Sequence, residues 1–364
     1  MLTSRIEKTL GLASDLDCDT LVSFIPENIY YLTGFWGESV VVCTKNGSTL
    51  IVPKLEAKRA EQAAPSCEIV TSDRGRSIIN EVLNKIKDKK ICSDCDDYST
   101  IELLVKNMPQ GSIIIDSEPF SAARMIKEMQ EIEMIAKASE IIDKLYEICT
   151  KEVRPGQSES SLQATLVYEA LKSGASLISY KWSINPFIIA SGPNSSYPHA
   201  EVTDRVFNQN DIIVIDLTLR YSGYVGDATR TFFLGRPNPR VKEIYEIVKL
   251  AQETGLDSLK SAQITGSIDE ATRSVIEKAG YGSDFIHSTG HGVGLEVHER
   301  PWIRIGNAEK IQGGMVVTVE PGIYIKNKYG VRIEDTVVVN NNSSTNYERA
   351  ESLNSFTKEL VEIS

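Results

Sequence analysis

The chain has 364 residues, a formal net charge of −11, 41% hydrophobic residues and 7% aromatic residues. This length exceeds the usual size of a single hydrophobic core, so we expect two domains. The composition is that of an ordinary globular protein, and no stretch concentrates Lys and Arg into the basic face that nucleic-acid binding requires, so nucleic acid is not an expected partner.

The N-terminal segment carries charges where a signal peptide needs an unbroken apolar core. No run reaches the roughly 18 apolar residues of a membrane span, so we expect a soluble, cytoplasmic protein that does not bind membranes. The six cysteines lack the density of a secreted disulfide scaffold and are expected to be reduced thiols. Cys92 and Cys95 form a CxxC sequence, but no second pair completes a zinc site.

The first third of the chain alternates short runs of β-branched residues with helical stretches, a pattern typical of an α/β layer. It predicts a compact first domain over 1–120, with strands at 21–25, 39–43, 49–53, 67–70 and 112–116. From 117 to 150 the apolar residues recur every three or four positions, which predicts one long amphipathic helix. We place the domain boundary near residue 120, at the start of that helix.

The remaining chain, 121–364, is predicted to form a second domain in which helices cover an antiparallel sheet. Helical spacing marks 158–174, 241–261 and 267–279. Apolar runs rich in β-branched residues predict strands at 211–217, 227–234, 314–320 and 330–339.

Two acids lie in the first pair of these strands. Asp216 is inside the run 211–217, and Asp227 begins the next run after a turn through 221–223. If the runs form a hairpin centred on that turn, the two aspartates face each other at about 4.5–5.5 Å between Cβ atoms. Such carboxylates would repel each other unless a cation lay between them, so the hairpin predicts a metal site.

The second pair of strands repeats the arrangement. Glu320 ends the run 314–320, Glu334 lies in the run 330–339, and a turn through 326–328 relates them. Because side chains alternate along a strand, three further residues share the faces of these acids and are candidates for supporting the ligands: Thr229, Thr318 and Arg332.

All four histidines fall between residues 199 and 298, close in sequence to the acids. Glycines at 290, 292 and 294 permit close backbone approach around His291. One imidazole and four carboxylates would nearly neutralise two divalent ions, and this donor set suits Mn²⁺, Co²⁺, Fe²⁺ or Zn²⁺ without choosing among them. Burying four acids for structural reasons alone would be expensive, which favours a metal centre.

These motifs resemble the pita-bread metallopeptidases, specifically the Xaa-Pro dipeptidase (prolidase) and aminopeptidase P branch. The resemblance extends over nearly the whole chain, through NIYYLTGF, ASGPNSSYPHA, DLTLRYSGYVGDATRTF, GHGVGLEVHERP, VEPGIYI and GVRIEDTVVV. It implies an α+β protein with an N-terminal creatinase-like α/β domain and a C-terminal pita-bread (creatinase/aminopeptidase) fold. It also implies a homodimer.

The resemblance assigns roles residue by residue. The implied metal ligands are Asp216, Asp227, His291, Glu320 and Glu334, with Asp227 and Glu334 shared by two divalent ions, Mn²⁺ or Co²⁺ first and Zn²⁺ or Fe²⁺ as alternatives. His199 and His298 are expected to bind the scissile peptide, and Glu320 to shuttle a proton. Arg332 and Tyr324 are expected to support the ligands, whereas His287 is expected in a packing or outer position.

The implied reaction is hydrolysis of the Xaa-Pro bond of dipeptides or short peptides, releasing the N-terminal residue. A metal-activated water would attack the carbonyl that precedes proline. Relatives often have an aromatic residue where this chain has Asn185 and an arginine where it has Trp302, so both positions are candidate determinants of substrate choice. The open alternatives are a broader aminopeptidase, a non-catalytic binding protein of this fold, and a purely structural metal.

Overall fold

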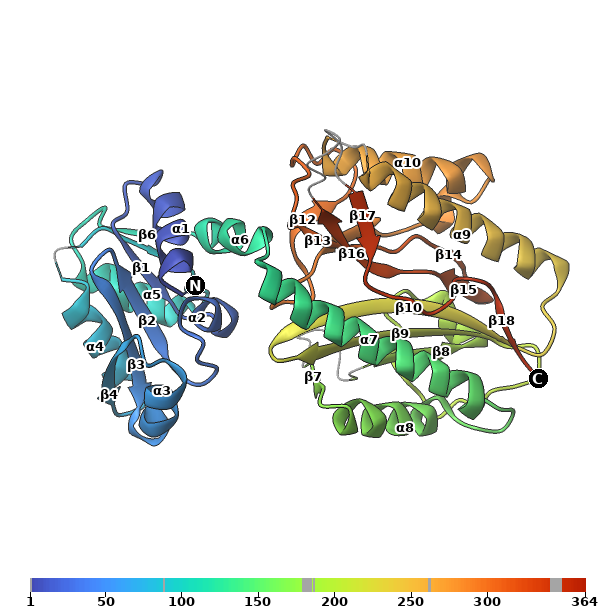
Figure 1. Cartoon of the computed structure of the whole chain (residues 1–364), viewed down its shortest axis with the longest axis horizontal. Helices are drawn as coiled ribbons and strands as arrows, with labels where there is room; N and C mark the ends of the chain where they lie inside the picture. Colours follow the sequence, from blue (N-terminus) through green and yellow to red (C-terminus); the bar gives the residue numbers. More distant parts are fainter. Residues whose placement is uncertain (1, 88, 179–184, 186, 261–262, 341–348) are drawn as a thin grey trace. The chain divides into compact units, whose positions relative to one another are not determined.

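The computed structural model of the chain describes residues 2–87, 89–178, 185, 187–260, 263–340 and 349–364. The chain divides into two compact units, Met1–Arg124 and Met125–Ser364 (Figure 1). No described helix has both the length and the apolar character needed to cross a membrane.

The first unit contains a mixed sheet with helices packed around it. Its strands are β1 (Thr20–Ser23), β2 (Val40–Thr44), β3 (Gly47–Pro53), β4 (Glu68–Ser72), β5 (Ile91–Ser93) and β6 (Ile113–Ile115). Its helices are α1 (Leu2–Ser14), α2 (Pro26–Thr33), α3 (Ala57–Ala63), α4 (Arg76–Lys85), α5 (Tyr98–Asn107) and α6 (Glu118–Met125). The sheet order over the described residues is β4-β3-β2-β1-β5-β6. The five predicted strands match β1 to β4 and β6, and the three-residue β5 was missed.

The long helix predicted from 117 to 150 is wrong, because the structure contains two helices there. The first is α6, and the second is α7 (Met129–Glu152), which begins with a capping box between Glu128 and Glu131. Between them the Lys127 amide donates to the carbonyl of Gly314, and the buried Lys127 ammonium lies 2.8 Å from the Glu299 carboxylate. These contacts with distant segments interrupt the helix and are invisible to its periodicity.

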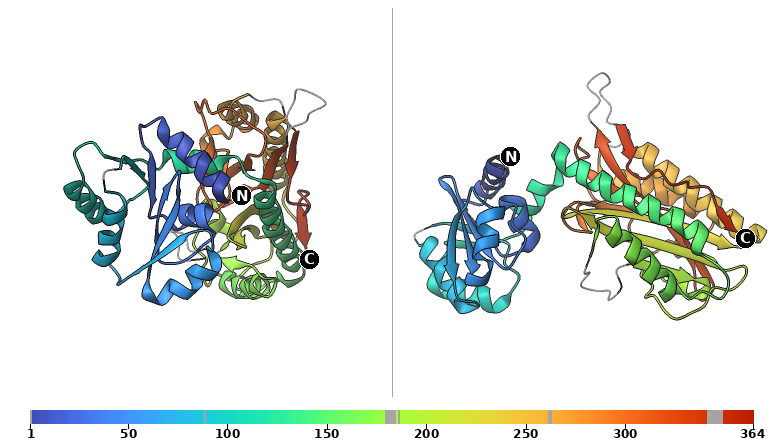
Figure 2. Two further views of the ribbon diagram at one scale, coloured as in Figure 1. Left: turned by 60° about the vertical axis from the view of Figure 1, so that its left-hand side comes forward. Right: turned by 60° about the horizontal axis from the view of Figure 1, so that its bottom comes forward.

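The described part of the second unit contains two five-stranded sheets with helices on their outer sides, together with a separate two-stranded sheet (Figure 2). One sheet has the order β18-β10-β9-β7 with β8 also paired to β9, and the other has the order β12-β11-β13-β16-β17. The first sheet contains β7 (Ser176–Leu177), β8 (Phe187–Ser191), β9 (Ile212–Tyr221), β10 (Tyr224–Leu234) and β18 (Val361–Ile363). The second contains β11 (Gly290–Gly292), β12 (Glu299–Ile303), β13 (Val316–Val319), β16 (Asp335–Asn340) and β17 (Arg349–Ser352).

The other three helices of this unit agree with the predicted ones. They are α8 (Glu159–Lys172), α9 (Pro239–Leu259) and α10 (Thr265–Lys278), while Ser261, at the predicted end of α9, lies outside the described residues. Ser158 caps α8 and Asn238 caps α9, each accepting a backbone N–H with its side chain. Helices α7 and α8 pack on the sheet of β8 to β10, and α9 and α10 pack on the other sheet (Figure 1).

The run 330–339 forms two strands instead of the single one predicted. Strand β15 (Tyr329–Arg332) pairs with β14 (Gly322–Ile325), and β16 then pairs with β13. Both ladders keep the same register, because Val319 is opposite Asp335 and Gly322 is opposite Arg332. Continuing that register across the gap puts Glu320 opposite Glu334.

Candidate metal centre

The first two acids come from the β9–β10 hairpin. Its turn residues Ser222 and Gly223 both have positive φ, as a two-residue type I′ turn requires. The predicted direct opposition of Asp216 and Asp227 is wrong: Asp227 is opposite Thr218, and Asp216 is opposite Thr229. The two aspartates are therefore diagonal neighbours on one face of the sheet, still within reach of a shared ligand.

Strand β10 holds Asp227 deep in the protein, since all eleven residues of the strand are buried. The Tyr146 hydroxyl, from α7, donates to the carbonyl of Ala228. The Thr336 hydroxyl donates to the Asp227 carbonyl, and the Asp227 amide donates back to the Thr336 hydroxyl oxygen. The backbone around Asp227 is thus fixed from both the helix layer and the second sheet.

His291 projects from β11, where glycines bring three backbone segments close together. A Cβ atom at Gly290 would lie 2.1 Å from the Thr318 carbonyl oxygen, and one at Gly292 would lie 2.2 Å from the Arg300 carbonyl oxygen. The His291 Nδ1 lies 3.1 Å from the Gly292 carbonyl oxygen and must donate to it. Its Nε2 is therefore an acceptor aimed at the acids, the arrangement typical of a metal-binding histidine.

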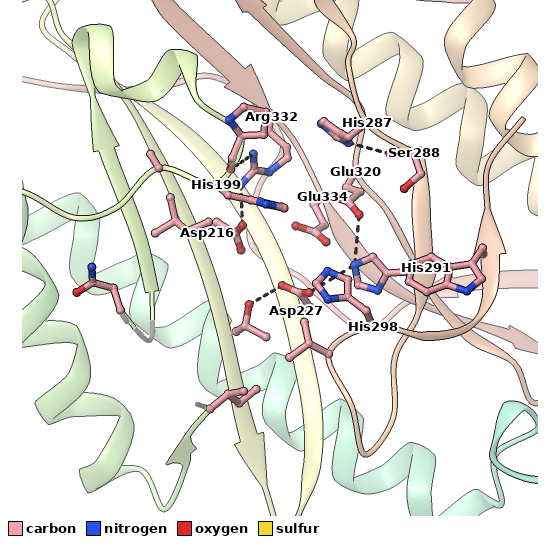
Figure 3. A pocket seen from close by; sticks show the side chains of 18 residues that line it. His199, Asp216, Asp227, His287, Ser288, His291, His298, Glu320, Arg332 and Glu334 are labelled. Atoms are coloured by element: carbon pink, nitrogen blue, oxygen red, sulfur yellow. Dashed lines mark hydrogen bonds and ion pairs between the residues drawn. The ribbon is translucent and has the colours of Figure 1, made fainter. Parts of the chain in front are cut away.

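The acids and His291 converge between the two sheets (Figure 3). Ligand atoms of Asp227, His291 and Glu334 all lie within 4.8 Å of one another. The His291 Nε2 is also 3.3 Å from Glu320 Oε1. Asp216 lies beside this cluster, with its Oδ2 2.6 Å from an Arg332 nitrogen. The structure therefore brings together all five predicted ligands, three of them in one compact group.

Burial and mutual repulsion act strongly on the carboxyl groups. Burial, followed by repulsion from the neighbouring carboxylates, raises the pKa values of Asp227 and Glu334 well above their usual range. Burial likewise raises the pKa of Glu320 to about 8 and lowers the pKa of His291 to about 4, so the imidazole is neutral at neutral pH. Without a metal ion, the protein therefore disfavours the charged forms of these carboxyl groups.

The donor set fits divalent metal ions. Among the described residues, Asp216 Oδ1 is buried without a hydrogen-bond partner, so it has an acceptor to offer. Four carboxylates and one neutral imidazole are the oxygen-rich ligands that Mn²⁺ and Co²⁺ accept. The only Lys or Arg among the described pocket-lining residues is Arg332, which cannot balance four acids. Metal ions would compensate this charge and occupy the unused acceptors.

Residues behind the acids form a connected set of hydrogen bonds. Thr229 donates to Glu334 Oε2 at 2.6 Å and accepts from Arg332 Nε at 3.0 Å. Thr318 donates to Glu320 and accepts the His291 amide. Arg332 also donates to the Tyr324 hydroxyl at 2.7 Å. Thr218, which was not predicted, donates to Asp227 Oδ1 at 2.9 Å. It could have been found from sequence, because it lies two residues after Asp216 and therefore on the same face of the strand.

His287 has a defined tautomer in this set. Its Nδ1 faces the Ser288 carbonyl oxygen at 2.8 Å and so donates, which leaves Nε2 to accept from the Tyr324 hydroxyl at 2.9 Å. Burial lowers the pKa of His287 to about 3. His287 thus lines the pocket as a neutral hydrogen-bonding residue.

The acids open into a pocket of about 460 Å³, all of whose described lining residues belong to the second unit. His199, His298, Asn185 and Trp302 line it, as do Ile178, Ile188 and Val297, which were not predicted. The Trp302 ring lies nearly parallel to His298, with an interplanar angle of 14° and centroids 6.4 Å apart. Burial lowers the pKa of His298 to about 3 and lowers that of His199 as well. Both imidazoles are therefore neutral at neutral pH.

Metal binding is expected to release protons near neutral pH. The pKa of about 8 leaves Glu320 largely protonated at neutral pH in the metal-free protein, and the raised pKa values of Asp227 and Glu334 act in the same direction, whereas metal ligands must be deprotonated. Affinity should therefore rise as the pH increases from about 6 to about 8. Calorimetric titration with Mn²⁺ in two buffers of different ionisation enthalpy measures the protons released. A pH-independent affinity without proton release would contradict this prediction.

Comparisons with known proteins agree with this arrangement. Residues 133–341 match the model of Metallopeptidase family M24, and residues 5–174 match the Creatinase/Prolidase N-terminal domain. The chain belongs to metallopeptidase family M24. Within this family it is 34% identical to the Xaa-Pro dipeptidase of Pyrococcus furiosus, over 96% of this chain and 99% of that protein.

Solved structures of relatives share the whole fold. The Xaa-Pro dipeptidase of Bacillus anthracis superimposes with a TM-score of 0.90 at 31% identity, covering 100% of both chains. The X-Pro aminopeptidase of Thermotoga maritima gives a TM-score of 0.86 at 30% identity, covering 98% of this chain and 99% of the other. The predicted pita-bread fold with a creatinase-like N-terminal domain is confirmed, and the protein is a metallopeptidase that uses divalent metal ions.

Proposed function

We propose that this M24 metallopeptidase cleaves the bond before proline in Xaa-Pro dipeptides or short Xaa-Pro peptides and releases the N-terminal residue. The observation that carries the proposal is the convergence of four carboxylates and the Nε2 of His291 in the lining of one pocket. The relatives named Xaa-Pro dipeptidase and X-Pro aminopeptidase support the substrate class.

The proposed metal ligands are Asp216, Asp227, His291, Glu320 and Glu334, which would hold two divalent ions, Mn²⁺ or Co²⁺ first. When bound, such a pair supplies Lewis-acid polarisation of a carbonyl and lowers the pKa of water. The proposal also includes a homodimer and a cytoplasmic location, which sedimentation and cell fractionation can measure.

The protein's own residues would orient the substrate and manage the proton. Glu320 is the proposed proton carrier, because its carboxylate lies at the base of the pocket 3.3 Å from His291 and has a pKa of about 8 before metal binds. His199 and His298 line the pocket as neutral imidazoles and would donate to the scissile carbonyl as negative charge develops on its oxygen. Asn185 and Trp302 would contact the residues around the scissile bond.

Hydrolysis of Gly-Pro, Ala-Pro-Ala and Met-Ala by metal-depleted enzyme resupplied with Mn²⁺, Co²⁺ or Zn²⁺ tests this proposal. We expect metal-dependent release of the first residue from both proline peptides and a rate on Met-Ala lower by at least about 10-fold, because a site built around the proline ring discriminates against other shapes. Equal cleavage of Met-Ala would instead identify a broader aminopeptidase. Tight metal binding without hydrolysis of any peptide would identify a structural metal or a binding protein.

A further inference from the structure

The segment that carries His199 is anchored on a single buried carboxylate. This segment runs from Ser191 at the end of β8, through the short helix η2 (Gly192–Ser196), to Arg205. Five hydrogen bonds from it end on Glu159, the first residue of α8: two from Ser191 at 2.7 Å, one from Asn194 at 3.0 Å, and two from Thr203 at 3.0 and 2.7 Å. Glu159 is completely buried.

The contacts of Glu159 reach both ends of the segment. Oε1 accepts from Ser191 on one side of His199, and Oε2 accepts from Thr203 on the other. The start of α8 reinforces this closure, because the amides of Glu159 and Ser160 donate to the carbonyls of Arg205 and Thr203. Glu159 therefore closes the segment into a loop with His199 at its far side.

The opposite side of the loop contacts the residues behind the metal centre. The Pro198 carbonyl accepts from Arg332 at 3.1 Å, and the Ser195 hydroxyl accepts the Gly330 amide at 3.0 Å. One turn further along α8, Gln163 donates to Asn185 Oδ1 and to the Phe187 carbonyl. One face of α8 thus holds both the loop of His199 and the segment of Asn185, two parts of the pocket wall.

We propose that Glu159 is a positioning residue for the reaction, acting through His199. In all five hydrogen bonds Glu159 is the acceptor, and the partner group donates. Neither carboxylate oxygen could therefore be replaced by an amide NH₂ group without facing a donor. In an isosteric glutamine the side-chain NH₂ group would face the backbone N–H of either Ser191 or Thr203, and that end of the loop would be released. His199 would then lose its fixed orientation in the pocket. The inference rests on the proposed function, since its kinetic readout is Xaa-Pro hydrolysis.

A double-mutant cycle separates positioning from general stability. Glu159→Gln is expected to lower kcat/KM on an Xaa-Pro peptide by about 10–100-fold with its metal content unchanged, as changes behind a functional group typically do. In a His199→Ala background the same change should alter kcat/KM by less than about 2-fold, because the group that it positions is already gone. Equal effects of Glu159→Gln in both backgrounds would overturn the inference, as would loss of bound metal that accounts for the whole decrease.

Glu131→Gln is the matched control. Glu131 is also a buried glutamate in the first turn of a helix, and its carboxylate accepts from Tyr224 at 2.9 Å and from the Glu128 amide at 2.8 Å. These two partners, Tyr224 and Glu128, lie outside the His199 loop, so the variant should lose heat stability and keep kcat/KM. A decrease in activity as large as that of Glu159→Gln would count against positioning. If Glu159→Gln does not fold, Asn194→Ala removes one of the same bonds and should show the same non-additivity with a smaller effect.

Histidine NMR gives a readout that is independent of the substrate. With four histidines in the sequence, the ¹H–¹⁵N imidazole signals can be assigned by substitution. Glu159→Gln should move the His199 signal and leave that of His291 in place. An unmoved His199 signal would overturn the inference. If wild-type enzyme fails to cleave Xaa-Pro peptides, the proposed function fails while this measurement still decides the role of Glu159.

Discussion

Replacing Asp227 with asparagine is expected to lower the rate of metal-dependent hydrolysis by more than the roughly 10–100-fold decrease that changes to residues behind metal ligands typically cause. Asp227 is buried at the centre of the acid cluster, and its neutral amide would neither attract nor bridge cations as a carboxylate does. Metal content by mass spectrometry and hydrolysis of an Xaa-Pro peptide measure the effect. Full metal-dependent activity in this variant would exclude Asp227 as a ligand.

The same substitution should stabilise the metal-free protein at neutral pH. Burial and neighbouring carboxylates raise the pKa of Asp227 in the folded protein above its value in the unfolded chain. Asp227 therefore lowers the free energy of unfolding at any pH above the unfolded-state pKa, and this destabilisation disappears at lower pH. Asparagine cannot ionise and removes that destabilisation, so the melting temperature of metal-free Asp227→Asn should exceed that of metal-free wild type at neutral pH. Added metal should then raise the melting temperature of wild type more than that of the variant. Asp94→Asn, which changes a buried aspartate of the first unit, is a control that should keep activity.

Arg230→Met is expected to lower the free energy of unfolding by about 3–5 kcal/mol, because it breaks a buried ion pair. Among the described residues, the buried Asp335 carboxylate then keeps only the partly exposed Lys358, 3.2 Å away, as a charged partner. The Arg230 side chain is only 2% exposed and lies 2.7 Å from Asp335 Oδ1. It also donates to four backbone carbonyls, those of Thr229, Glu334, Phe356 and Thr357. Denaturant unfolding of the metal-free protein measures the loss.

Two further variants sharpen the Arg230 prediction. Arg230→Met combined with Asp335→Leu should recover part of the loss, since removing both charges is less harmful than removing one. Arg74→Met breaks the exposed pair with Glu38 and should leave the unfolding midpoint close to wild type. Equal shifts for Arg230→Met and Arg74→Met would contradict the assigned importance of the buried pair.

Most helices and strands and the neighbourhood of the site followed from local sequence patterns, whereas the pita-bread fold followed from the family resemblance. Turn residues between runs of β-branched residues identified both hairpins, and the concentration of histidines pointed to the same region. The exact pairing did not follow, because the β9–β10 turn is centred between Ser222 and Gly223, one residue later than direct opposition of Asp216 and Asp227 requires. Such a small shift in a turn has no signal in the composition of the strands.

Features that depend on distant contacts could not be predicted from sequence. Periodicity continues through 126–128, and the contacts of Lys127 with Gly314 and Glu299 explain why the helix stops there. Glu159 resembles an ordinary acidic residue in the first turn of a helix, since its partners at Ser191 and Thr203 are 32 and 44 residues away. In both cases the decisive partners are distant in sequence, so local patterns carry no signal for them.

The division of the acids between two hairpins has a consequence for biosynthesis. When a nascent chain has emerged from the ribosome only as far as β10, it contains Asp216 and Asp227 but neither His291 nor the two glutamates. About a hundred further residues must be translated before Glu334 can complete the set. We therefore expect cation capture to be among the last events of maturation, so that metal scarcity would yield full-length, folded but inactive polypeptide.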